Sequence, residues 1–501
     1  MHSFSKNISA ELCREGLINL KMTARVLGVL LLFEAVLLGI AGGVSLIYKE
    51  GDAIYFLYSI LITVACGLGL MLYGRKAMKM MGRRDAYLIV GISWILFTLL
   101  GMLPFRLGNY IPSVTDAFFE TMSGFTTTGA SILDNIEALP HGLLFWRSLT
   151  QWIGGLGIVF FSMALLPIFG GSGQLLFMTE STGVKHIKVH PKVAVMARYI
   201  GSFYIVITCI EGVLLWVGGM EPFDAVCHAI TTTATGGFST KQASIAYWNS
   251  PFIEYVITVF MFISAVSFPL YVLALKGRFR TLFRDDELLW YMKSVLILTA
   301  VISLSLIFIN QYDVEKAVRA ALFQVVSLHT SCGFATDDYA QWPQFTWPLL
   351  LFAMVAGGCT GSTGGGVKNM RLLIAFRAIR NQFRQILHPR AILPLKVSGQ
   401  IMEPRILTTV LVFIVSYMTC LFLGWLLLMA MGLPFMEAIS TAVSAMGNTG
   451  PALGAYGPAY SWAALPDAAK WTLSSLMLIG RLEIFGFLLI FYKSTWSGSW
   501  S

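Results

Sequence analysis

Long apolar stretches separated by short polar segments recur along the whole chain. The first stretch, RVLGVLLLFEAVLLGIAGGVSLIY at residues 25–48, exceeds the about 20 residues that a helix needs to cross a bilayer. Ten such spans are predicted, at residues 25–48, 53–74, 86–105, 143–169, 195–219, 252–275, 289–310, 346–378 (interrupted), 404–432 and 468–492. The pattern predicts an all-α membrane protein with ten transmembrane helices.

Four connections between spans carry a second pattern, an amphipathic run too short to span followed by a polar turn with glycine. They read TDAFFETMSGFTTTGAS (115–131), FDAVCHAITTTATGGFS (223–239), RAALFQVVSLHTSCGFA (319–335) and MEAISTAVSAMGNTGPA (436–452). Each predicts a pore half-helix and an extended turn, so we expect four span-pore-span repeats with pseudo-fourfold symmetry. The predicted units are residues 1–84 (two N-terminal transmembrane helices), 85–172, 173–280, 281–398 and 399–501 (pore repeats one to four).

Aligning the four turns on one glycine predicts a cation filter. The alignment gives Thr127, Thr128, Gly129; Ala234, Thr235, Gly236; Ser331, Cys332, Gly333; and Asn448, Thr449, Gly450. Twelve or thirteen residues upstream stand Asp116, Asp224 and Glu437, which suit a helix N-terminus, whereas the third copy has Ala320 there. Half-helices entering from outside would point their negative C-terminal ends at the membrane centre, and the turns could aim carbonyls at an ion. Small residues for close helix packing are the competing explanation for any single turn, and fourfold recurrence favours the filter.

Composition and charge narrow the function classes. The chain is 56% hydrophobic and 12% charged, with a net charge of +9. The segments predicted to be cytoplasmic hold 27 of the 35 Lys and Arg residues, which places both termini in the cytoplasm. The excess of Lys and Arg therefore reflects the orientation of the chain in the membrane, and no nucleic-acid partner is expected.

The seven cysteines are scattered, and no nucleophile, metal cluster or paired carboxylates converge, so we expect no enzyme. No G-x-G-x-x-G unit occurs, so no nucleotide should bind this chain.

Six glycines interrupt the eighth span in AGGCTGSTGGGVKN, residues 356–369. Glycine weakens a helix, so this stretch predicts an irregular loop about halfway across the membrane. We interpret it as an intramembrane gate made of Gly357, Gly358, Thr360, Gly361, Ser362, Thr363, Gly364, Gly365 and Gly366. The order differs from a phosphate-binding G-x-x-x-x-G-K-[ST] loop, while a packing kink stays an alternative.

Two basic features lie near this gate. Arg481 falls within the last span, where arginine requires a partner or water. It is predicted to complete the gate as an electrostatic barrier, or else to pair structurally with Glu34, Glu211 or a gate-loop carbonyl. The basic segment that begins at Lys368 is either a membrane-surface anchor or a docking site for a cytosolic regulator.

The four turns, FWRSLTQWIGGLGIVFF (145–161), GGCTGSTGGGVKN (357–369) and GRLEIF (480–485) together resemble the bacterial Trk/Ktr potassium transporter superfamily. The two extra N-terminal spans resemble its TrkH/TrkG-like Trk branch. The resemblance implies K⁺ uptake across the bacterial inner membrane, a homodimer in lipid, and a cytosolic NAD- or ATP-binding regulatory ring resembling TrkA. Relatives that favour Na⁺ carry serine at the first filter glycine, so Gly129 favours K⁺. The fourth turn, GNTGP, differs in composition from the other three, which argues against stringent selectivity for K⁺ over Na⁺.

A proton- or sodium-coupled secondary transporter of cations is the alternative. Such transporters more often show two related halves, whereas this chain shows four units.

Overall fold

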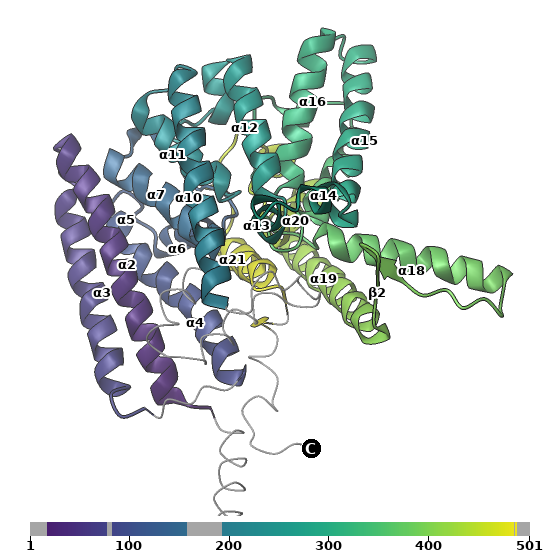
Figure 1. Cartoon of the computed structure of the whole chain (residues 1–501). Coiled ribbons are helices and arrows are strands. Elements are labelled where there is room, and N and C mark those ends of the chain that lie inside the picture. The colour runs from purple at the N-terminus through teal and green to yellow at the C-terminus, as the bar shows by residue number, and fades with distance from the viewer. Residues whose placement is uncertain (1–17, 78–82, 158–192, 485, 488–501) are drawn as a thin grey trace, which may run out of the picture.

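The computed structural model describes residues 18–77, 83–157, 193–484 and 486–487. These residues are predominantly helical, with one antiparallel ribbon of β1 (Lys396–Val397) and β2 (Gln400–Ile401). Figure 1 shows α2 (Leu20–Tyr48) and α3 (Ala53–Tyr73) side by side at one edge of a helix bundle. At another edge α18 (Asn369–Leu387) projects away from the bundle.

The remaining helices are described in chain order as four units. The first unit contains α4 (Arg83–Gly101), α5 (Leu103–Leu107), α6 (Val114–Phe125) and α7 (His141–Leu156). The second contains α10 (Val193–Val217), α11 (Pro222–Thr233), α12 (Pro251–Ser264) and α13 (Phe268–Leu275). After α14 (Phe279–Phe283), the third contains α15 (Asp286–Phe308), α16 (Val314–His329), α17 (Thr346–Ala356) and α18. The fourth contains α19 (Pro404–Ala430), α20 (Phe435–Gly447) and α21 (Asp467–Arg481).

One order of contacts recurs in all four units. The short helices α6, α11, α16 and α20 each pack between the helix before and the helix after them, such as α6 between α4 and α7. The helix that follows each short helix also contacts the short helix of the next unit, in the pairs α7–α11, α12–α16 and α17–α20. The pair α21–α6 joins the last unit to the first. The contacts therefore form a closed circuit that runs through α6, α7, α11, α12, α16, α17, α20 and α21 and returns to α6.

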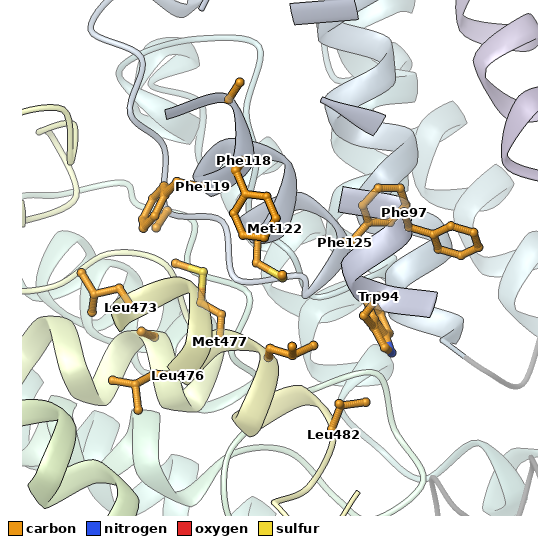
Figure 2. Packing of buried hydrophobic residues seen from close by; sticks show 14 of the residues in the cluster. Trp94, Phe97, Phe118, Phe119, Met122, Phe125, Leu473, Leu476, Met477 and Leu482 are labelled. Atoms are coloured by element: carbon orange, nitrogen blue, oxygen red, sulfur yellow. The ribbon is translucent and has the colours of Figure 1, made fainter. Parts of the chain in front are cut away.

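Buried apolar side chains pack α6 against α21 and α4. Figure 2 shows Met122 of α6 near Met477 of α21, and Phe125 of α6 near Phe97 of α4. The Phe97 and Phe125 ring centroids are 5.6 Å apart, and all four side chains are buried. Within a bilayer, where lipid is as apolar as these side chains, close packing rather than escape from water stabilises such a junction.

The spans agree only in part with the expectation of ten. Six helical segments of the described residues are long and apolar enough to cross a membrane, or seven if α12 and α13 form one bent span. The predicted spans 143–169 and 468–492 begin with α7 and α21 and continue into residues outside the described part. The predicted span 346–378 is interrupted as expected, with α17 on one side of the break and α18 on the other.

The expectation of one continuous helix over residues 252–275 is wrong. Helices α12 and α13 meet at 91°. Pro269 lies in the first turn of α13, where it can donate no hydrogen bond to a preceding helical turn. The break exposes the carbonyl of Ala265 and the N–H of Phe268, which bond to Cys359 and Gly361 of the glycine-rich segment at 2.8 and 3.1 Å.

Candidate functional site

The four short helices end in the same backbone conformation. A residue with positive φ follows each helix: Thr127 (53°), Thr235 (52°), Ser331 (58°) and Asn448 (53°). Each of these four residues donates its N–H to the carbonyl three residues earlier, and the next residue donates to the carbonyl five residues before it. These bonds satisfy carbonyls that the helix end leaves free.

The alignment of the second turn on Gly236 is wrong by one residue. A positive-φ glycine follows two residues after each of those four positions, and in the second unit it is Gly237. The equivalent triplet is therefore Thr235, Gly236 and Gly237, and Ala234 instead caps α11. Two signals in the sequence support this register. In both the second and the third turn the ring glycine is followed directly by Phe, and Asp224 lies 13 residues before Gly237, as Asp116 lies 13 residues before Gly129.

The four glycines abut one another's turns in a ring. A Cβ on Gly129 would overlap the carbonyl oxygen of Gly236, and one on Gly237 would overlap that of Cys332. In the same way Gly333 lies against the carbonyl of Thr449, and Gly450 against that of Thr128. Each glycine therefore packs on the peptide that precedes the next glycine, and the fourth contact returns to the first unit. Positive φ and the absence of room for a side chain both require glycine here.

A polar cavity opens on this ring. Its lining includes all four ring glycines and residues that follow three of them, among them Ser131, Phe238 and Pro451. Asp116, Asp224 and Glu437 lie in the first turns of their short helices, as expected. In the third unit Glu315 takes this place, because α16 begins one turn earlier than the aligned segment.

The residues 357–366, hereafter the glycine loop, form an irregular segment between α17 and α18 that contacts the ends of three short helices. Thr363 Oγ1 donates to the carbonyl of Thr233 at 3.2 Å, and the N–H of Gly365 donates to Ser331 Oγ at 2.6 Å. A Cβ on Gly364 would lie 2.8 Å from the carbonyl of Thr330, and one on Gly365 would overlap that of Gly447. The loop is thus packed directly against the helix ends that carry the ring.

Side chains from other elements anchor the loop. Glu287 of α15 accepts two hydrogen bonds at one carboxylate oxygen, from the N–H of Thr360 at 2.6 Å and from that of Met370 at 3.0 Å. Asn369 Nδ2 donates to the carbonyl of Gly357 at 2.6 Å, and buried Lys368 donates to that of Gly364. Non-helical backbone at membrane depth must be satisfied by such partners.

Arg481 bonds to a glycine-loop carbonyl, one of the alternatives that the sequence left open. Its Nη1 donates to the carbonyl of Thr363 at 2.8 Å, and its Nη2 donates to the carbonyls of Gly154 and Gly155 at the end of α7. The partly buried guanidinium therefore connects the loop to the first unit. Glu483 pairs with Arg371 of α18.

Two polar side chains of α7 were missed, although FWRSLTQWIGG contains both. Arg147 forms a buried ion pair with Glu120 of α6, with Nε 2.8 Å from Oε1. Gln151, one turn later, bonds to the second turn on both sides of Gly237. Charged and amide groups inside a predicted span were the available signal, because they need partners there.

Comparisons with known proteins identify the family of this chain. The family model TrkH, described as a cation transport protein, matches residues 55–500. The Trk system potassium uptake protein TrkH of Salmonella typhimurium is 36% identical over 476 residues, covering 94% of this chain and 98% of that protein. The Trk system potassium uptake protein TrkG of Escherichia coli is 35% identical over 458 residues, with 90% and 94% covered. The crystal structure of the potassium transporter TrkH from Vibrio parahaemolyticus gives a TM-score of 0.85 at 34% identity and covers 95% of this chain and 99% of that one. This chain therefore belongs to the TrkH family of cation transport proteins.

Proposed function

We propose that this chain takes up K⁺ through the ring of four turns, which acts as its selectivity filter. Membership of a cation transport family makes it a transporter rather than an enzyme. The relatives named above are potassium uptake proteins, which supports K⁺ as the substrate. The observation that carries the filter proposal is the closed circuit in which each ring glycine lies against the next unit's carbonyl.

The proposed filter residues follow the corrected register. They are Thr127, Thr128, Gly129; Thr235, Gly236, Gly237; Ser331, Cys332, Gly333; and Asn448, Thr449, Gly450. Carbonyls in such turns can replace the hydration shell of a K⁺ ion. The C-terminal ends of α6, α11, α16 and α20 meet near the ring, so their dipoles would favour a cation there. Four repeats around one axis would account for both features.

The test is a reversal potential measured on the purified protein in a planar bilayer, with K⁺ on one side and Na⁺ on the other. A potential displaced toward the K⁺ equilibrium value is expected. The absence of current, together with K⁺ uptake into vesicles that requires a proton or Na⁺ gradient, would refute the passive pore and favour the coupled transporter.

The glycine loop and Arg481 serve as the gate of this pore in our proposal. The loop packs against the helix ends under the ring, and Arg481 adds a positive charge bonded to it. Opening would require the loop to leave these contacts, which glycine's backbone freedom permits. Shortening residues 357–366 should raise the leak current, and an unaltered open probability would refute the gate.

Partner binding on the cytoplasmic side is also a proposal. The outer half of α18 exposes Arg380 and Arg384 together with Phe383 and Ile386, a surface suited to anionic lipid or to a regulatory protein. We propose that it contacts a cytosolic NAD- or ATP-binding ring resembling TrkA, in a homodimer in the bacterial inner membrane with both termini cytoplasmic. Charge reversal at both arginines should weaken binding of the purified ring to protein in nanodiscs, and unchanged binding would refute this site.

A further inference from the structure

Gln151 of α7 clamps one of the four turns by its backbone. The side chain is completely buried. Its Nε2 donates to the carbonyl of Gly236 at 2.7 Å, and its Oε1 accepts the N–H of Phe238 at 3.0 Å. These two bonds flank Gly237, the ring glycine of the second unit. A side-chain amide offers the same donor and acceptor as a peptide, so Gln151 pairs with this turn as a neighbouring strand would.

The same contact explains why residue 236 is a glycine. The backbone of Gly236 does not have positive φ, so its conformation does not demand glycine. A Cβ there would instead collide with the Gln151 amide, lying 2.9 Å from its Nε2. The equivalent residues of the other units are Thr128, Cys332 and Thr449, which all carry side chains. Gln151 thus occupies space that a filter side chain would otherwise need.

Arg147 supports this clamp from one turn earlier on α7. Its Nη1 donates to the carbonyl of Ser239 at 3.1 Å, and its guanidinium carbon lies 4.2 Å from the centroid of the Phe238 ring. Together Arg147 and Gln151 contact the second turn at Gly236, Phe238 and Ser239, on both sides of its ring glycine. The carbonyl of Gly236 is also the one against which Gly129 packs, so a displacement there reaches the first unit.

We infer that Gln151 is a positioning residue for ion discrimination, holding the Gly236 carbonyl at the place that the ring requires. This inference rests on the proposed function of the ring as a filter. Discrimination between K⁺ and Na⁺ depends on where the coordinating carbonyls lie and how strongly they interact with the ion. Replacing Gln151 should therefore lower the preference for K⁺ while conduction itself persists.

The test compares Gln151→Leu with wild type in planar bilayers under K⁺ and Na⁺ on opposite sides. Leucine keeps the approximate volume and removes both hydrogen bonds. We expect the K⁺ over Na⁺ permeability ratio to fall about five- to tenfold, the size expected from losing one or two hydrogen bonds. The matched control is Gln324→Leu. Gln324 is a buried glutamine of α16, and its Nε2 donates to the carbonyl of Asp337, which lies outside the four filter triplets. The control should keep the wild-type ratio.

Two outcomes separate this inference from the proposed function. A wild-type protein without K⁺ preference would refute the filter itself. A wild-type protein that prefers K⁺, with the same ratio in Gln151→Leu, would overturn only the role of Gln151.

A second pair of variants keeps the inference falsifiable if Gln151→Leu fails to fold. Gly236→Ala alone should reduce the yield of folded protein on size exclusion, because the new methyl group meets the Gln151 amide. Adding Gln151→Ala should restore that yield, because the amide that the new methyl group meets is removed. The K⁺ over Na⁺ permeability ratio of the double variant should stay below that of wild type. A double variant that is no better folded than Gly236→Ala, or one with the wild-type ratio, would overturn the inference.

Discussion

Replacing Gly129 by serine tests the ring most directly. Gly129 has a φ of 85°, and a Cβ placed on it would overlap the carbonyl oxygen of Gly236. The substitution should therefore lower the free energy of unfolding in two separate ways, through the strained backbone conformation and through the contact with the neighbouring unit.

The magnitudes of the two costs can be separated with a control glycine. A residue with a Cβ in the left-handed region costs about 1–2 kcal/mol. Forcing extra atoms into a packed site costs about 1–3 kcal/mol more, and here the group that must move is a carbonyl of the ring. Gly432, between α19 and α20, has a φ of 93° with nothing within 4 Å of its would-be Cβ. Gly432→Ser therefore carries the first cost alone.

The assay is the reversal potential between K⁺ and Na⁺ in planar bilayers, alongside the thermal midpoint of the purified protein. Both variants should lower the midpoint, and Gly129→Ser should lower it further. Only Gly129→Ser should move the reversal potential toward zero, because only it displaces the Gly236 carbonyl. A folded Gly129→Ser protein with the wild-type reversal potential, or an equal change in Gly432→Ser, would refute the reasoning.

Three further predictions concern the groups around the ring. Arg481→Gln removes the positive charge bonded to the glycine loop and should raise the leak current several-fold; a leak equal to wild type would count against the barrier. Glu287→Ala leaves two backbone N–H groups of the loop region without their acceptor, so a thiol reagent should label buried Cys359 faster, and unchanged labelling would contradict the anchoring role. Glu120→Gln leaves the Arg147 guanidinium buried without its carboxylate, which should cost about 3–5 kcal/mol of stability and lower the thermal midpoint; an unshifted midpoint would show that the pair is dispensable.

Local patterns were enough to predict a predominantly helical membrane protein and the positions of its four short helices. The apolar stretches and the four amphipathic runs each act over a few helical turns, so α6, α11, α16 and α20 fall within the expected segments. The glycine loop was predicted for the same reason, because glycines weaken a helix wherever it is packed. The identity of Gly237 as the ring glycine could also have been found, since the carboxylate spacing and the Gly-Phe pair were in the sequence.

The partners of these elements were decided only by the tertiary structure. The sequence placed a proline at 269, but the 91° bend between α12 and α13 also depends on the glycine loop, which lies about 90 residues later and bonds to the exposed backbone. The choice among partners for Arg481 was likewise open until α21 was packed beside the loop.

Gln151 shows the distinction most clearly. The sequence determined that a buried amide lies on an apolar helix and that a glycine lies at 236, but nothing in either local pattern connects them. Their contact exists because α7 packs against α11 of the next unit when the four units close into a circuit. Periodicity determines which face of a helix is apolar, while the pairing of two buried polar groups depends on which helices become neighbours.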